Sequence, residues 1–194
     1  MNQIKSAKTK YPVLDIIKNR WSPRSFSAKA ISKEDMNTII EAATWSFSAM
    51  NEQPWRYVVA HKGTPLFNAF LDLLNGGNKP WNQNAAALVL SVQTTTYTNN
   101  GNQNINALHD IGAANILLTL QANSMGIYTH LMEGFAKPLA KELLQLGEGV
   151  EPVVMIALGY PDVAEKLAEP FKARELSSRS RKGLNEILLD PQFN

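Results

Sequence analysis

Apolar residues along the chain recur at two spacings, one typical of helices and one typical of buried strands. In residues 32–45 they recur every three to four positions, which places them on one face of a helix. Ser32 precedes this run and can cap it, and Asp35 three residues later completes a capping-box pattern. The pattern therefore predicts a helix that begins after Ser32 and ends near Trp45.

The same two spacings predict the other elements. Further helices are predicted over residues 13–19, 64–74, 106–124, 136–146 and 184–189. Strands are predicted over residues 56–61, 87–93, 127–129 and 152–158. The helix over residues 106–124 is apolar on most sides, so we expect it in the centre of the core and consider it for a subunit interface. The alternation of strands and helices indicates one sheet between helical layers, in an α/β or α+β fold.

The composition is that of an ordinary globular protein, with 44% hydrophobic and 19% charged residues and a formal charge of +2. The length predicts one domain over residues 1–194. The charge is too small to indicate binding to nucleic acid or to an acidic membrane surface. Cysteine is absent, which excludes disulfides, thiolate metal sites, iron–sulfur clusters and cysteine nucleophiles.

The sequence pattern predicts neither a secretory signal nor a membrane-spanning helix. The first ten residues are polar with scattered lysines, and no apolar segment follows them, so no secretory signal is predicted. The longest apolar stretch, residues 105–126, includes Asp110 and Asn115 and is too polar for an unassisted membrane span. Together with the lack of cysteine, this leads us to expect a cytoplasmic protein.

Residues 20–26, Arg-Trp-Ser-Pro-Arg-Ser-Phe, concentrate two guanidinium groups and two hydroxyls. Pro23 disfavours helical geometry at Ser22 and lacks a backbone donor, so the preceding helix should end before it. Arg20 and Arg24 each present a planar fork of donors suited to a phosphate, and a serine hydroxyl adds another donor. The segment fits either a phosphate site or a helix end with solvated charges.

Other polar loops could line a flat, phosphorylated heterocycle. Ser48, Asn51 and Gln53 offer a hydroxyl and amides that can read ring carbonyls and nitrogens, although they also fit an ordinary loop. Gly134, which follows Glu133, would let a main-chain N–H approach a ligand closely. Three further residues could either contact such a ligand or lie in a solvated turn or tail: Asn78, Arg179 and Arg181.

Motifs for other chemistries are missing or incomplete. Residues 147–149, Gly-Glu-Gly, lack the third glycine of a dinucleotide fingerprint and follow a helix instead of a strand. His61, His109 and His130 lack ligand spacing, so no metal site is predicted. No serine lies in a Gly-x-Ser-x-Gly elbow, so a hydrolase triad has no support.

Four segments together resemble the nitroreductase family of flavin enzymes. They are Arg20-x-Ser22-x-Arg24-x-Phe26, Ser48-Ala49-x-Asn51-x-Gln53-Pro54-Trp55, Met132-Glu133-Gly134-Phe135 and Arg179-x-Arg181. Their order and rough spacing agree with the family, and the resemblance covers nearly the whole chain. It implies an α+β fold of three layers, with a central, mainly antiparallel sheet flanked by helices. It also implies a homodimer that binds two FMN molecules at the interface between its subunits.

The resemblance implies a role for each matching residue. The implied FMN-binding residues are Arg20, Trp21, Ser22, Arg24, Phe47, Ser48, Ala49, Asn51, Asn78, Leu131, Met132, Glu133, Gly134, Arg179 and Arg181. The arginines and Ser22 would hold the phosphate and the ribityl chain, and residues 47–51 of a second subunit would line the flavin ring. Glu133 and the Gly134 amide would lie near flavin N5, which makes them the catalytic candidates. Phe47 replaces the proline or serine common in the family, so its ring would narrow the pocket or stack near the flavin.

The implied activity is transfer of hydride from NADH or NADPH, through flavin N5, to a nitroaromatic, a quinone or a similar small acceptor. The cofactor carries the chemistry, which agrees with the lack of a general acid–base dyad in the sequence. Two alternatives stay open. One is another flavin reaction on the same fold, such as reductive dehalogenation or oxidative chemistry, with the loop over residues 94–104 as a lid. The other is a protein that stores or senses FMN without turnover. The expected partners are a second copy of the chain and a small-molecule acceptor, with no nucleic acid and no membrane.

Overall fold

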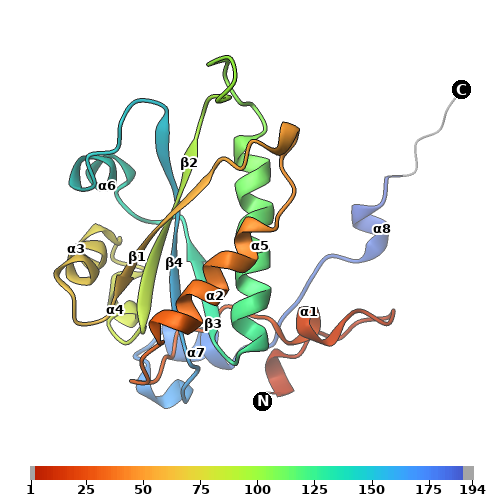
Figure 1. The fold of residues 1–194 in the computed structure, drawn as a ribbon. Coiled ribbons are helices and arrows are strands. Elements are labelled where there is room, and N and C mark those ends of the chain that lie inside the picture. Colours follow the sequence, from red (N-terminus) through yellow and green to blue (C-terminus); the bar gives the residue numbers. More distant parts are fainter. Residues whose placement is uncertain (1–2, 190–194) are drawn as a thin grey trace, which may run out of the picture.

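A four-stranded antiparallel sheet forms the centre of the computed structural model, which describes residues 3–189 (Figure 1). The strands lie in the order β1-β2-β4-β3, and each pairs with antiparallel neighbours. Their bounds are β1 (Trp55–His61), β2 (Ala87–Thr94), β3 (Tyr128–Met132) and β4 (Val150–Gly159). The predicted antiparallel sheet is confirmed. The single domain predicted over residues 1–194 includes residues 1–2 and 190–194, which lie outside the described range.

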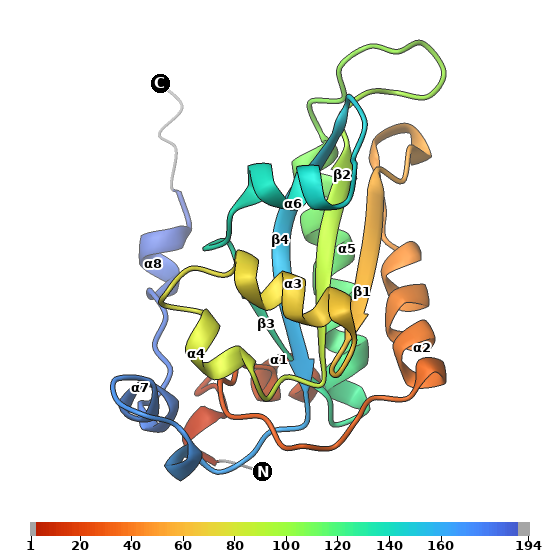
Figure 2. The ribbon, with the colours of Figure 1, turned by 90° about the vertical axis from the view of Figure 1, so that its left-hand side faces the viewer.

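Helices cover both faces of the sheet and complete three layers (Figures 1 and 2). One face is covered by α2 (Lys33–Thr44) and α5 (Ala107–Ser124). The other is covered by α3 (Pro65–Leu73), α4 (Lys79–Asn82) and α6 (Lys137–Leu143). Because β2 is buried on both faces, successive residues face different layers: Leu88 packs beneath α3, and Val89 packs beneath α5.

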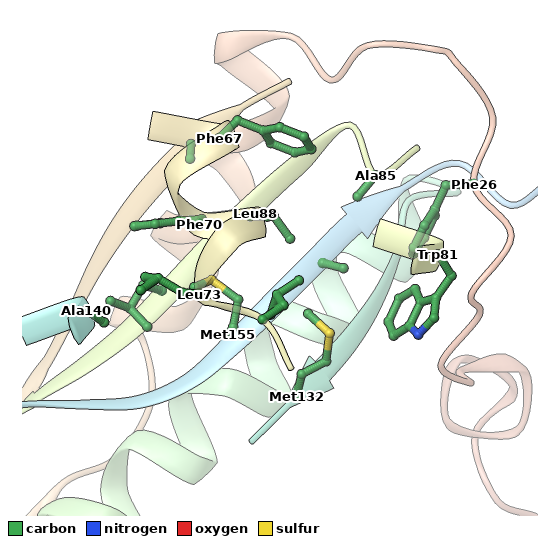
Figure 3. Close-up of a cluster of buried hydrophobic side chains, with 14 of the residues drawn as sticks. Phe26, Phe67, Phe70, Leu73, Trp81, Ala85, Leu88, Met132, Ala140 and Met155 are labelled. Atoms are coloured by element: carbon green, nitrogen blue, oxygen red, sulfur yellow. The ribbon is translucent and has the colours of Figure 1, made fainter. Parts of the chain in front are cut away.

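Each face has its own hydrophobic cluster, and both are built from the residues that give the sequence its periodicity. Figure 3 shows the cluster beneath α3, where Phe67 and Phe70 lie over Leu88 and Met155. On the opposite face, the largest fully buried side chains are Ile39, Ile111, Leu118, Ile127, Val89, Ile156 and Leu158. Burial of a side chain of this size typically stabilises the fold by about 1.5–3 kcal/mol. These two clusters fix the sheet that supports the site.

Side-chain caps set the starts of α2 and α3, and the cap by Ser32 was predicted. The Ser32 hydroxyl accepts a hydrogen bond from the Asp35 N–H at 2.9 Å, and the Thr64 hydroxyl accepts one from the Phe67 N–H at 3.2 Å. The prediction for α5 is only partly right, because this chain buries one face of the helix. The opposite face leaves Leu108 62% exposed and Ile116 45% exposed.

Short helical segments from both ends of the chain lie around the lower end of the sheet and of α5 in Figure 1. They are η1 (Gln3–Lys5), α1 (Asp15–Asn19), η3 (Ala164–Lys166) and α7 (Phe171–Leu176). After α7 the chain leads to α8 (Leu184–Ile187), which lies apart from the body. The short helices α4 and α7 were not predicted from the sequence. None of the helices in residues 3–189 has the length and apolar character needed to cross a membrane.

Candidate functional site

The arginine–serine segment, residues 20–26, forms an extended loop that is anchored at both ends. α1 ends at Asn19, and Arg20 already has extended φ and ψ values of −67° and 125°. Phe26 is 2% exposed and pairs with Pro161 just beyond the end of β4. The helix therefore ends before Pro23 as predicted, and Arg20 to Arg24 lie along the surface between two fixed points.

A buried carboxylate holds the middle of this loop. Glu175 in α7 is 2% exposed, and its Oε1 accepts hydrogen bonds from the Arg24 and Ser25 N–H groups, both at 3.1 Å. Its Oε2 accepts from the Arg24 N–H at 3.0 Å. A charged acceptor makes such bonds stronger than neutral ones. Sequence reasoning missed Glu175, which is 150 residues from its partners and carries no local motif.

The N-terminal segment ties α7 to the same loop. Lys5 is 5% exposed, and its Nζ donates hydrogen bonds to the carbonyl oxygens of Arg174 and Ser177 at 3.1 and 2.5 Å. The same Nζ lies 5.0 Å from the centre of the Trp21 ring, within the range of a cation–π contact. Lys5 therefore joins three segments that are distant in the sequence.

Three of the predicted phosphate-binding arginines come together. Burial lowers the pKa of the Arg20 guanidinium, and the nearby positive charges of Arg179 and Arg181 lower it further. Arg179 donates hydrogen bonds to the carbonyl oxygens of Lys5 and Lys18 at 2.9 and 2.8 Å, so its position is fixed. Within residues 3–189 none of these arginines forms an ion pair with a carboxylate. An anion bound among them would reduce the repulsion between their positive charges.

Arg24 lies apart from that cluster, beside Trp81 of α4. Its guanidinium carbon is 5.8 Å from the centre of the Trp81 ring. On another side the Trp81 ring contacts the His130 ring, with 4.5 Å between the ring centres. His130 is held in turn by the loop, because its Nδ1 donates a hydrogen bond to the Pro23 carbonyl oxygen at 2.9 Å. Trp81 and His130 therefore support the loop from the side of β3.

The burial of His130 has a consequence for pH. Burial lowers the pKa of His130 to about 4, and the positive charge of Arg24 acts in the same direction. The unfolded chain takes up this proton near pH 6.5, whereas the folded protein resists it until about pH 4. We therefore expect the free energy of unfolding to fall by about 2 kcal/mol between pH 7 and pH 5. Urea unfolding at these pH values measures the fall.

The matched variant for this expectation is His130→Gln, which keeps an N–H donor but cannot titrate. Its free energy of unfolding should change less than that of the unmodified protein over the same pH range. An equal change in both proteins would contradict the assignment to His130.

The turn after α3 and the segment after β3 form a close contact. The Asn78 Nδ2 donates to the Gly134 carbonyl oxygen at 3.2 Å, and the Asn75 N–H donates to the same oxygen at 3.1 Å. A Cβ on Gly134 would come within 2.2 Å of the Asn75 Nδ2 and 2.9 Å of the Asn78 Nδ2. Glycine is therefore required here unless both amides move. Within residues 3–189 the Gly134 N–H donates no hydrogen bond, so it is free for a ligand.

The other predicted residues of this segment are oriented differently. The Glu133 side chain is 83% exposed and lies 3.4 Å from the Lys137 Nζ, so its carboxylate faces solvent. The Leu131 side chain is partly exposed on β3. The Met132 side chain is buried in the cluster of Figure 3, where its sulfur accepts a hydrogen bond from Asn82. Met132 can therefore offer a ligand only its main chain.

The segment over residues 47–51 lies at the far end of the sheet from the arginines (Figure 1). It precedes Trp55, which pairs with Gln93, whereas Phe26 lies beyond the opposite end of β4. One chain therefore does not bring Phe47, Ser48, Ala49 and Asn51 to the other predicted residues.

A strained backbone distinguishes this segment, which includes η2 (Ala49–Asn51). Met50, Asn51 and Gln53 have φ values of 54°, 55° and 51°, in the left-handed region that non-glycine residues rarely adopt. The buried carboxylate of Asp110 in α5 fixes the segment by accepting a hydrogen bond from the Ala49 N–H at 3.0 Å. Sequence reasoning missed Asp110, which is 61 residues from its partner.

Comparison with known proteins shows the family of this chain. Residues 17–75 match the family model described as the nitroreductase family. A solved oxidoreductase containing FMN is 30% identical, has a TM-score of 0.92, and aligns over 100% of this chain and 99% of its own. The chain belongs to the nitroreductase family.

Two further relatives of this nitroreductase-family chain extend the comparison. A protein from Archaeoglobus fulgidus, with the provisional name NADH dehydrogenase/NAD(P)H nitroreductase, is 28% identical over 76% of this chain and 84% of its own length. A structure from Desulfovibrio desulfuricans, provisionally named a nitroreductase in complex with FMN, has a TM-score of 0.74 at 24% identity. It covers 96% of this chain and 100% of its own, and it shares the fold.

Proposed function

We propose that this member of the nitroreductase family is an FMN-dependent NAD(P)H oxidoreductase. The observation that supports it best is the cluster of Arg20, Arg179 and Arg181, which holds three positive charges without a carboxylate partner in the described residues. Such a cluster suits a phosphate monoester, which carries close to two negative charges at neutral pH. The NAD(P)H-dependent name of the Archaeoglobus protein and the FMN of the two solved structures support the same assignment.

The residues on this chain fit FMN. The arginine cluster can take the phosphate, and Ser22, two residues after Arg20, offers a hydroxyl donor. The Asn75 and Asn78 amides form a cradle at Gly134 that has no room for a Cβ, and the Gly134 main-chain N–H has no partner within residues 3–189. When bound, FMN supplies hydride exchange at its N5 atom.

The chain's own residues would bind and orient the cofactor. Arg20, Arg179 and Arg181 would hold the phosphate, and Arg24 would add a guanidinium from beside Trp81. Glu175 keeps the Arg24 main chain in place. The Gly134 N–H would donate a hydrogen bond to the flavin, and Asn78 holds the Gly134 carbonyl so that this N–H keeps its direction. Glu133 extends from the same segment into solvent, where a nicotinamide or an acceptor could reach it.

A second copy of the chain completes the site in this proposal. Three large apolar side chains lie exposed on the single chain: Trp45 is 82% exposed, Phe47 66% and Met50 76%. A second copy could cover them. They lie next to the loop whose Ser48, Ala49 and Asn51 cannot reach the arginines of their own chain. Light scattering tests this point, because a homodimer has twice the 21.5 kDa mass of one chain and a monomer would contradict it.

Steady-state turnover tests the proposed activity. Purified protein loaded with FMN should reduce menadione, a quinone, with NADH or NADPH as the donor, and omission of FMN should remove the rate. FMN binding without turnover of menadione or of a nitroaromatic would favour a storage protein or another flavin reaction over this proposal.

A further inference from the structure

The segment before α1 and the segment before α8 enclose a groove of about 740 Å³. Residues 7–13 form one wall, and residues 179–185 with Leu188 form the other. Arg179 and Arg181 belong both to this groove and to the cluster around Arg20. A molecule in the groove would therefore lie directly beside the proposed FMN phosphate.

Five cationic side chains line the groove and no acidic one does, among the residues that the structure describes. They are Lys8, Lys10, Arg179, Arg181 and Lys182. None of them has an ion-pair partner within residues 3–189. A single FMN phosphate engages only the end that holds Arg179 and Arg181. Lys8, Lys10 and Lys182 thus form a surplus of positive charge that the proposed cofactor does not use.

An aromatic ring accompanies this surplus charge. The side chain of Tyr11 lines the groove and is 56% exposed, so its ring is accessible to a ligand. The Lys10 Nζ lies 5.7 Å from the centre of the Tyr11 ring. An exposed ring next to a lysine can stack with a nucleobase while the ammonium pairs with a phosphate on the adjoining sugar.

We infer that this groove binds the adenosine end of NADPH, with Lys8 and Lys10 on its 2′-phosphate and Tyr11 against the adenine. NADH lacks this phosphate, so the groove makes the protein prefer NADPH. The inference rests on the proposed function, because it names the donor of the same reaction. It adds a second phosphate site, separate from the arginines that hold FMN.

Direct binding of two isomers tests the groove without any turnover. Calorimetry with the FMN-loaded protein compares adenosine 2′,5′-bisphosphate with adenosine 5′-diphosphate, which carry the same number of phosphates in different positions. We expect the 2′,5′ isomer to bind at least tenfold more tightly. The variant Lys8→Ala combined with Lys10→Ala should remove most of this difference and retain its FMN. Equal affinities for the two isomers in the unmodified protein would overturn the inference.

Kinetics provides the second readout. In the Lys8→Ala, Lys10→Ala variant, kcat/KM should fall at least tenfold with NADPH and less than twofold with NADH. The matched control is Lys33→Ala combined with Lys62→Ala, which removes two exposed lysines on the other side of the molecule and should change neither value. Equal losses with both nucleotides would contradict a 2′-phosphate site. If neither nucleotide reduces the flavin, the proposed function fails, and the binding of the two isomers still decides whether the groove recognises a 2′-phosphate.

Discussion

Arg20→Ala combined with Arg24→Ala is expected to weaken FMN binding at least a hundredfold, so that the purified variant is nearly colourless. Each alanine substitution removes a charge-assisted contact of about 1.5–3 kcal/mol, and the loss of two such contacts weakens the binding constant by more than a factor of one hundred. Arg20 belongs to the cluster with Arg179 and Arg181, and Arg24 lies on the other side of the loop beside Trp81. Titration of the apoprotein with FMN, followed by flavin fluorescence, measures the dissociation constant.

The conservative pair Arg20→Lys and Arg24→Lys separates charge from shape. Lysine keeps the positive charge and loses the planar fork, so this variant should bind FMN with intermediate affinity. The control Lys33→Ala with Lys62→Ala removes the same amount of charge elsewhere and should bind FMN normally. Full FMN occupancy in the double alanine variant would overturn the phosphate assignment.

Glu175→Ala is expected to lower the free energy of unfolding by about 3 kcal/mol and to weaken FMN binding as well. The Arg24 and Ser25 N–H groups would lose their acceptor, and a buried donor without a partner typically costs about 1–3 kcal/mol. The loop that carries Arg24 would then lose its support from α7. Urea unfolding gives the stability, and FMN titration at low temperature gives the affinity of the folded fraction.

The control for Glu175→Ala is Glu165→Ala, which removes an exposed carboxylate ten residues earlier. This control should leave both stability and FMN affinity close to those of the unmodified protein. If Glu175→Ala unfolds at the same urea concentration as the control, Glu175 does not hold the loop in the way that its hydrogen bonds indicate.

Much of the fold follows from local patterns in the sequence. The strands over residues 87–93 and 152–158 are predictable because central strands are buried on both faces and therefore continuously apolar. The starts of α2 and α3 are predictable because Ser32 and Thr64 are side-chain caps. By contrast, α4 and α7 have four and six residues, and helices so short depend on tertiary contacts that no local pattern encodes.

The residues that hold the site in place could not be predicted from local sequence patterns. The motifs at residues 20–24 and 47–51 are visible in the sequence. Glu175 and His130 hold the first segment and Asp110 holds the second, and all three lie on distant elements. Nothing near Glu175 in the sequence distinguishes it from an exposed helical carboxylate. The loop over residues 94–104 is the candidate lid of the alternative flavin reaction. The structure folds it back through a bridge between Thr96 and Gln103 and joins it to the Glu52 carboxylate through the Thr98 N–H.

The visible absorption spectrum of the purified protein, recorded before and after anaerobic addition of NADPH and then NADH, tests the proposed function most directly. A flavin spectrum that bleaches with NADPH at a lower concentration than with NADH is the expected result. It would establish the cofactor and its reduction together. A colourless protein that also fails to bind added FMN would contradict the account, because the arginine cluster and the Gly134 cradle would then serve no flavin.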